Sequence, residues 1–273
     1  MMTSYLSDLY SLAGTTAVVT GGAGAIGTVM SDALLRAGAN VLALSRSQQS
    51  LDILLARYRE QPELAARIAG RCVDCGSEDA VEEAYREAAS LFSAPEILVN
   101  GVGGNRGKSS FVDLDLTTFR DVLDLNLGAG LVIPTKVFCR HWISEGISGS
   151  IINLTSMASY TPLSGVWAYD AAKAATLNLT MAAAVEFAPY GIRVNAIAPG
   201  FFLGKQNKHL LVDETTGGYT QRGRDVIAHT PFKRFGEVSE LAGATVFLAS
   251  ARASGFVTGV SIPVDGGYLV HNI

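Results

Sequence analysis

Short apolar runs alternate along the chain with longer segments in which apolar and polar residues recur at helical spacing. The apolar runs predict strands at 16–20, 40–45, 71–74, 96–100, 149–156, 192–200 and 259–267. The longer segments predict helices at 25–38, 49–61, 78–92, about 115–145 and about 166–188. Strands that are apolar throughout and alternate with helices are typical of a parallel sheet covered on both faces. The pattern therefore predicts an α/β fold, with a doubly wound parallel sheet of about seven strands.

Nothing in the sequence divides the chain into parts. It has no Ser/Gly/Pro-rich linker and no internal repeat, so we expect a single domain over 1–273. The longest interruption of the pattern is at about 201–235, where Gly, Lys, His and Thr mix without periodicity. Long irregular segments in α/β proteins often cover a site. We therefore expect a substrate lid at about 201–235.

Composition narrows the class of protein. Hydrophobic residues make up 48% of the chain and charged residues only 17%, which argues against disorder. The net charge of −4 argues against a general nucleic-acid binder. The mean hydropathy is +0.27, yet no run approaches about 18 apolar residues, so we expect no membrane span. The N-terminal stretch MMTSYLSDLYSLAG has neither a basic region nor a long apolar core, and a cytoplasmic location is expected.

The chain has three cysteines, and the odd count suits a reducing compartment. Cys72 and Cys75 have C-x-x-C spacing, but no second pair or histidine cluster accompanies them. We therefore expect no metal site.

A glycine-rich turn, VVTGGAGAIG (18–27), joins the first predicted strand to the first predicted helix. Glycine lets the backbone turn tightly and approach a ligand, and a helix N-terminus offers free N–H groups to a phosphate. A doubly wound sheet binds a dinucleotide at this place. The spacing T-G-x-x-x-A-x-G departs from the strict fingerprint, so a turn without a ligand stays open. The candidate cofactor residues are Gly21, Ala25, Ile26 and Gly27.

The end of the second predicted strand, LALSRSQQS, bears on which cofactor binds. No carboxylate lies between Asn40 and Leu51, and Arg46 follows Ser45. A carboxylate here typically binds the ribose of NAD, whereas an arginine binds the 2′-phosphate of NADP. The sequence favours NADP(H), with contacts from Ser45 and Arg46. NAD(H) stays open as the alternative, as does a solvated Arg46.

The run VWAYDAAKAATLNLT (166–180) places Tyr169 and Lys173 one helical turn apart. Tyrosine has a pKa of about 10, and a neighbouring ammonium lowers it, so Tyr169 can exchange a proton with a carbonyl or alcohol oxygen. Ser156 ends the fifth predicted strand, where α/β sheets build their sites. Asn126 interrupts an apolar helix, where a buried amide needs a partner. A helix cap and a structural amide are the alternatives for these two residues.

Seven stretches occur in the order typical of the short-chain dehydrogenase/reductase family: TGGAGAIG, NGVG (100–103), LNLGAG, INLTS, YDAAK, RVNAIAPG and VDGG. The chain resembles this family over essentially its whole length. The resemblance implies a single-domain Rossmann-type fold that binds a dinucleotide and acts as an NAD(P)-dependent oxidoreductase. Two departures stand out. Ala25 replaces the usual middle glycine, and NGVG replaces N-N-A-G, so Gly101 has no side-chain amide.

The resemblance also implies roles for individual residues. It gives a catalytic tetrad of Asn126, Ser156, Tyr169 and Lys173, in which Tyr169 transfers the proton. Lys173 and Tyr169 also contact the nicotinamide ribose, and Asn126 holds a water in a proton relay. The remaining implied cofactor contacts are Asp74 at the adenine, Asn100, Gly101, Pro199 and Gly200.

The distribution of basic residues bears on the substrate. The segment 201–235 carries six basic residues against three acidic ones: Lys205, Lys208, Arg222, Arg224, Lys233 and Arg234 against Asp213, Glu214 and Asp225. A basic excess in an acidic chain favours an anionic substrate, and an arginine such as Arg106 suits a carboxylate. Ordinary solvated loop charges are the alternative. The candidate substrate contacts are Asn105, Arg106, Lys205 and Asn207.

Within the family, GVGGNRG, APGFFLGKQNKHLL, AHTPFKRFGE and FVTGVSIPVDGG resemble the D-mannonate oxidoreductase (fructuronate reductase) branch. This implies a role in sugar acid metabolism, the interconversion of D-fructuronate and D-mannonate. That branch is NAD-linked, in conflict with the NADP interpretation of Arg46.

Three alternatives to a D-mannonate oxidoreductase stay open. They are a gluconate 5-dehydrogenase-like enzyme, a carbonyl reductase acting on a thioester or steroid, and a non-catalytic cofactor-binding regulator. The family also implies a homotetramer. We expect no nucleic-acid or membrane partner.

Overall fold

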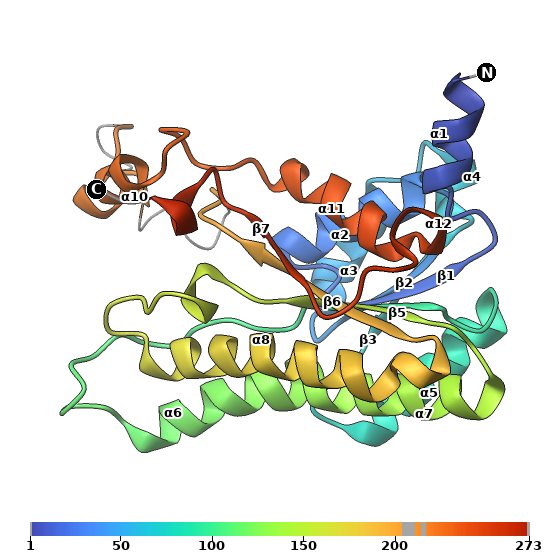
Figure 1. Cartoon of the computed structure of the whole chain (residues 1–273), viewed down its shortest axis with the longest axis horizontal. Helices are drawn as coiled ribbons and strands as arrows, with labels where there is room; N and C mark the ends of the chain where they lie inside the picture. The colour runs from blue at the N-terminus through green and yellow to red at the C-terminus, as the bar shows by residue number, and fades with distance from the viewer. Residues whose placement is uncertain (1, 204–210, 214–216, 272–273) are drawn as a thin grey trace.

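The computed structural model describes residues 2–203, 211–213 and 217–271, which form one seven-stranded parallel sheet with helices on both faces (Figure 1). The strand order is β3-β2-β1-β4-β5-β6-β7. The strands are β1 (Thr16–Thr20), β2 (Asn40–Ser45), β3 (Ile68–Cys72), β4 (Ile97–Asn100), β5 (Ser150–Leu154), β6 (Arg193–Pro199) and β7 (Ser261–Val264). The chain winds outward from β1 on one side and from β4 on the other. This confirms the doubly wound Rossmann-type sheet.

Each face of the sheet has its own apolar core. Against one face pack α2 (Ala25–Arg36), α3 (Gln48–Ala56) and α11 (Ala242–Ala249). Against the other pack α5 (Glu78–Leu91), α7 (Ile133–Glu145) and α8 (Trp167–Phe187). Successive β1 residues pack into opposite cores. Val19 packs against the side of α2, α3 and α11, and Val18 against the side of α5, α7 and α8. The other helices are α1 (Met2–Tyr10), α4 (Pro62–Ala65), α6 (Leu116–Leu123), α10 (Gln221–His229) and α12 (Ala251–Ser254).

Side-chain caps fix where several helices begin. Ser47 accepts a hydrogen bond from Ser50 N at the start of α3, and Ser77 accepts one from Ala80 N at the start of α5. These caps satisfy N–H groups that have no partner within the helix. The start of α2, described below, has no such cap.

The long predicted helix at 115–145 is continuous but changes its winding. Between α6 and α7 the stretch Asp124–Val132 is a π-helix, a local form common at functional sites. By length and composition, Leu116–Glu145 would suffice to cross a membrane. Its apolar side chains Val122, Val137, Phe138 and Trp142 are instead buried in the protein, so packing accounts for its composition.

Several features differ from the sequence expectations. The predicted helix at 49–61 ends at Ala56, and α4, α11 and α12 were not predicted. β3 begins three residues earlier than predicted and pairs with β2 from Val41–Ile68 to Ser45–Cys72. Its side chains are mostly only partly buried, which weakens the apolar signal. α1 was not predicted, and it docks on the body through Ser250 Oγ, which donates to Leu9 O at 2.7 Å. The 201–235 segment, expected to be irregular, contains α10, which Thr220 caps.

Candidate active site

The site begins where the winding direction of the sheet reverses, between β1 and β4. Their last residues, Thr20 and Asn100, are register partners. Thr20 Oγ1 accepts a hydrogen bond from Gly101 N at 3.0 Å, which ties together the two loops that leave this edge. In doubly wound sheets, ligands bind in the crevice at this reversal.

The turn from β1 to α2 is a cradle made of backbone. Gly24 precedes α2 without a side-chain cap, so the first N–H groups of the helix are available to an anion. Gly21 has φ +64°, and a Cβ there would stand 2.7 Å from Gly101 O. A Cβ on Gly27 would collide with Gly21 O, whereas Ala25 is exposed and its methyl is tolerated. The cradle fits the pyrophosphate of a dinucleotide.

The unusual NGVG sequence has a steric reason. A Cβ on Gly101 would stand 2.5 Å from Thr20 O, so this arrangement of the two loops needs glycine. The preceding Asn100 donates from Nδ2 to Thr135 Oγ1 at 3.0 Å and to Asn153 Oδ1 at 2.9 Å. Its buried Oδ1 has no partner among the described residues. An unpartnered acceptor beside the cradle is consistent with a site completed by a ligand.

The ends of β2 and β3 bring the expected adenosine contacts together. Val73 N donates to Ser45 O at 2.8 Å. The pKa of the Cys75 thiol is raised to about 12, mostly by burial; the Asp74 carboxylate also raises it and Arg46 lowers it, so both charged groups lie near this thiol. Arg46 is exposed and faces outward from a strand end without a carboxylate. This corner can hold a 2′-phosphate.

Lys173 and Asn126 approach each other across the loop after β4. Lys173 is 6% exposed, and its Nζ donates to Leu154 O at 2.7 Å. A Cβ on Gly103 would stand 3.4 Å from Lys173 Nζ and 2.7 Å from Asn126 Oδ1. The backbone of Gly103 therefore lies between the two side chains.

Asn126, in the π-helical stretch, holds this loop with both ends of its amide. Its Nδ2 donates to Gly104 O at 2.7 Å and to Val122 O at 2.8 Å. Its Oδ1 accepts from Gly104 N at 3.1 Å. The buried amide thus has the partners that the sequence argument required. The run GVGG (101–104) is the sequence signal for this contact, because a side chain at Gly103 would collide with the Asn126 amide.

Ser156 caps a turn and also contacts Tyr169. Its Oγ accepts from Ala158 N at 3.2 Å in the short turn Met157–Ser159. A hydrogen bond with the same hydroxyl lowers the pKa of Tyr169. Ser159 Oγ donates to Lys173 O at 2.6 Å, which ties this turn to α8. Three of the four tetrad candidates therefore meet where β5 ends and α8 begins.

The pKa of Tyr169 is raised above its ordinary value. Burial raises it most, the Ser156 hydrogen bond lowers it, and the Asp170 carboxylate raises it. The expected lowering by Lys173 is not the controlling effect here, because Lys173 Nζ bonds Leu154 O and lies 5.7 Å from the centre of the Tyr169 ring. Burial also lowers the pKa of Lys173, to about 8.

Asp170 lies next to Tyr169 within the YDAAK stretch, and the motif gave it no role. Its Oδ1 accepts from Leu163 N at 3.2 Å, which holds the turn before α8. Its Oδ2 is buried without a partner among the described residues. Burial raises the pKa of this carboxyl group.

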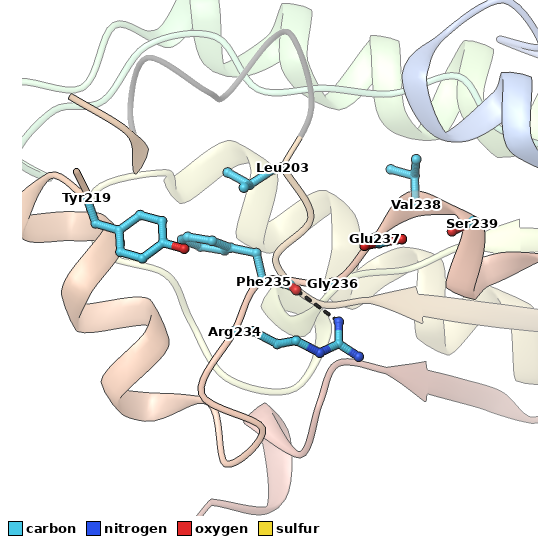
Figure 2. Close-up of a pocket in the computed structure, with 8 residues that line it drawn as sticks. All are labelled: Leu203, Tyr219, Arg234, Phe235, Gly236, Glu237, Val238 and Ser239. Carbon is cyan, nitrogen blue, oxygen red and sulfur yellow. Dashed lines mark hydrogen bonds between the residues drawn. The ribbon is translucent and has the colours of Figure 1, made fainter. Parts of the chain in front are cut away.

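The segment after β6 encloses two cavities. Figure 2 shows the larger, about 400 Å³, whose lining residues are Leu203, Tyr219, Arg234, Phe235, Gly236, Glu237, Val238 and Ser239. A second cavity of about 250 Å³ lies nearby, against Phe201, Phe202 and Asp265. The tetrad candidates line neither cavity. Gly200 joins this segment to β7, since its N–H donates to Val264 O at 2.9 Å directly after Pro199.

Of the four candidate substrate contacts, the structure describes two, Asn105 and Arg106. Lys205 and Asn207 lie outside the described residues. Asn105 Nδ2 donates to Gly107 O at 2.8 Å, and the exposed Arg106 lies 3.7 Å from Asp121. Arg234 binds both oxygens of Glu240 and lowers the pKa of that carboxyl to about 2, so its charge is already compensated. No group of three or more His, Cys, Asp or Glu in the described ranges is placed to hold a metal.

Comparison with known proteins gives one family. The model for short chain dehydrogenases matches residues 15–214. An uncharacterized oxidoreductase of Bacillus subtilis, UxuB, is 39% identical over 96% of this chain and 97% of its own. A 2-dehydro-3-deoxy-D-gluconate 5-dehydrogenase of the same organism is 36% identical over 97% of this chain and 98% of its own.

Solved structures agree. A Haemophilus influenzae protein provisionally described as a D-mannonate oxidoreductase, with NAD bound, superposes with a TM-score of 0.88 at 32% identity over 98% of this chain and 99% of its own. A gluconate 5-dehydrogenase from Burkholderia cenocepacia, in complex with NADP and tartrate, gives a TM-score of 0.86 at 30% identity over 98% of this chain and all of its own (100%).

Proposed function

This chain belongs to the short-chain dehydrogenase family, and on that premise we propose that it interconverts D-fructuronate and D-mannonate with a nicotinamide cofactor. The class of enzyme is an NAD(P)-dependent oxidoreductase, and its relatives act on sugar acids. The observation that carries the proposal is the meeting of Ser156, Tyr169 and Lys173 at the carboxyl edge of the sheet.

The relatives' names share one chemical feature. Gluconate 5-dehydrogenase and 2-dehydro-3-deoxy-D-gluconate 5-dehydrogenase both react at carbon 5 of a six-carbon acid whose carboxylate is carbon 1. Reduction of D-fructuronate also forms the alcohol at carbon 5 of D-mannonate. The substrate class is therefore a sugar acid whose carboxylate lies four carbon–carbon bonds from the reacting carbon. A gluconate 5-dehydrogenase-like reaction is the second candidate, favoured by these same names.

The residues have distinct parts in the reaction. The cofactor, when bound, supplies or accepts the hydride. Tyr169 donates a proton to the ketone oxygen or removes one from the alcohol, and Ser156 orients that oxygen. Lys173, with its ammonium buried beside the phenol, holds the cofactor ribose. Asn126 fixes the loop at Gly104 that closes this side of the site.

For the cofactor we favour NADP(H), because Arg46 is exposed at the end of a strand that carries no carboxylate. NAD(H) remains the competing choice, since one similar structure holds NAD and another NADP. We further propose a homotetramer in the cytoplasm, with the 201–235 segment as lid and with Asn105 and Arg106 on the loop that lines the substrate site.

The test is a panel of D-fructuronate, 5-keto-D-gluconate and simple ketones, each with NADH and NADPH, followed at 340 nm. The proposal expects turnover of D-fructuronate above the others. No turnover of any sugar acid, together with tight cofactor binding, would favour a non-catalytic regulator instead.

The matched variant is Tyr169→Phe. We expect it to abolish turnover and leave cofactor affinity nearly unchanged, because only the proton-carrying hydroxyl is removed. Retained turnover would show that Tyr169 does not transfer the proton.

A further inference from the structure

The loop after β4 is fastened to the turn that precedes α8. Ser109 N donates to Gly165 O at 3.2 Å, and Trp167 Nε1 donates to Ser109 O at 3.1 Å. The Phe111 ring meets the Trp167 ring edge-on, with 5.2 Å between their centres. We call these three contacts the loop clasp. They hold the backbone of Ser109 from both sides, and so they fix the residue before it relative to α8.

That residue, Lys108, lies with its methylene chain on bare backbone. A Cβ on Gly165 would stand 2.8 Å from Lys108 Cγ and 2.9 Å from Lys108 Cε. Gly165 also has φ +78°, a conformation that glycine adopts readily. The side chain therefore packs directly on the backbone of Gly165. Seating it in advance reduces the rotamer entropy that a ligand would otherwise have to overcome.

The side chain of Lys108 is exposed. No carboxylate in the described ranges lies within ion-pair distance of its ammonium, whereas nearby Arg106 faces Asp121 at 3.7 Å. A positive charge held by the loop beside the site attracts an anion.

Lys108 lies on the side of the site where α8 begins. Gly165, on which it packs, is in the turn before α8, four residues before Tyr169 and two before the first helical residue, Trp167. In the proposed substrate the carboxylate is separated from the reacting carbon by four carbon–carbon bonds, roughly 5 Å in an extended chain. A sugar acid with its reacting carbon at Tyr169 therefore needs a cation to one side of that residue, and the clasped loop brings Lys108 to the side of this turn.

We propose that Lys108 binds the substrate carboxylate and that the loop clasp holds it beside the turn that leads into α8 and Tyr169. This assignment rests on the proposed function, because it takes the reacting carbon to lie at Tyr169. It makes Lys108 the residue that selects acids over uncharged polyols.

The experiment measures binding of D-mannonate and D-gluconate to the NADPH-saturated full chain, in which these alcohols cannot react, by calorimetry, and KM and kcat are measured in parallel. We expect Lys108→Ala to weaken acid binding by about tenfold to a hundredfold, the range for a lost charge-assisted hydrogen bond. Lys108→Arg should restore most of the affinity. Arg120→Ala, which removes an exposed cation from α6, is the matched control and should bind like wild type. Affinity for uncharged D-mannitol and for NADP⁺ should not change in Lys108→Ala.

Several outcomes overturn the assignment: unchanged acid binding in Lys108→Ala, a larger loss in Arg106→Ala, an equal loss for D-mannitol or NADP⁺, or no acid binding by wild type. Acid binding that depends on Lys108 in a chain without turnover supports the carboxylate site and refutes the proposed function. Normal turnover with unchanged Lys108→Ala kinetics refutes the carboxylate site alone.

Discussion

Asp170 stands beside the tyrosine that we propose transfers the proton, and its charge opposes ionisation of that phenol. The carboxylate raises the pKa of Tyr169. Asp170→Asn keeps an oxygen that can accept from Leu163 N and removes the charge. We expect the acid limb of the kcat/KM profile for alcohol oxidation to move to lower pH, because ionised Tyr169 then forms at lower pH.

Ser156→Ala acts in the opposite direction. It removes the hydrogen bond that lowers the pKa of Tyr169, so the same limb should move to higher pH in whatever activity remains. The test compares the kcat/KM profiles of Asp170→Asn, Ser156→Ala and wild type over the same pH range. Limbs that stay at the wild-type pH would mean that Tyr169 is not the group that titrates.

Arg46 is the residue at which the cofactor preference can be tested. Arg46→Ala should weaken NADPH much more than NADH, because only NADPH carries the 2′-phosphate. Fluorescence titration with each cofactor measures the difference. Equal losses of affinity for the two cofactors would show that Arg46 does not bind the 2′-phosphate.

Among single residues, sequence reasoning identified those that stand in family motifs. It missed those whose roles depend on contacts with the backbone of other loops. Tyr169, Lys173, Ser156 and Asn126 stand in recognisable patterns. Thr20, Gly103 and Trp167 contribute through contacts with loops distant in sequence, and a spacing rule cannot show such contacts.

Among the elements, the junction of α7 and β5 is tightly packed. Gly149 lies against Trp142, which is fully buried and donates from Nε1 to Pro95 O at 2.6 Å. Gly149→Ala would bring a methyl onto that ring, so we expect a loss of about 1–3 kcal/mol of unfolding free energy. Urea denaturation measures it.

Gly243→Ala in α11 is the matched control. No atom of the described residues lies within 4 Å of a Cβ at this exposed helical position, so the variant should gain about 0.4–1 kcal/mol. If Gly149→Ala also gains stability, the contact with Trp142 does not limit the side chain at this position.

Elements with strong apolar patterns were predictable, and the others depended on tertiary partners. β1 and β2 were predicted residue for residue, because buried central strands are apolar throughout. β3 was shifted because as an edge strand it is only partly buried, and α1 was missed because its place depends on α12. The π-helical stretch has no periodicity of its own that a helix pattern would distinguish.

For the molecule as a whole, the burial of Lys173 links stability to pH. Its pKa is about 8 in the folded chain and about 10.5 in an unperturbed lysine. Below pH 8 folding must bury a charge. Between these values the unfolded chain holds a proton that the folded chain has lost, so this group's contribution to stability rises with pH.

We expect Lys173→Met to remove this increase in the free energy of unfolding with pH. The stability of the variant relative to wild type should fall by up to about 3 kcal/mol as the pH rises from 8 to 10.5. Urea unfolding of both ligand-free proteins across this range measures the difference. The buried cysteines, with pKa values raised to about 12, are common to both and cancel. Parallel curves would mean that Lys173 does not titrate in this range.

The position of β1 inside the sheet also bears on how the chain is made. β1 pairs with β2 on one side and with β4 on the other, yet β4 does not begin until Ile97. During synthesis, β1, β2 and β3 therefore leave the ribosome before the second partner of β1 exists. Until it arrives, the backbone edge of TAVVT is open to strands of other nascent chains. Rapid synthesis of Ile97–Asn100 therefore protects the growing chain from aggregation. A chaperone that covers the open edge of β1 would give the same protection.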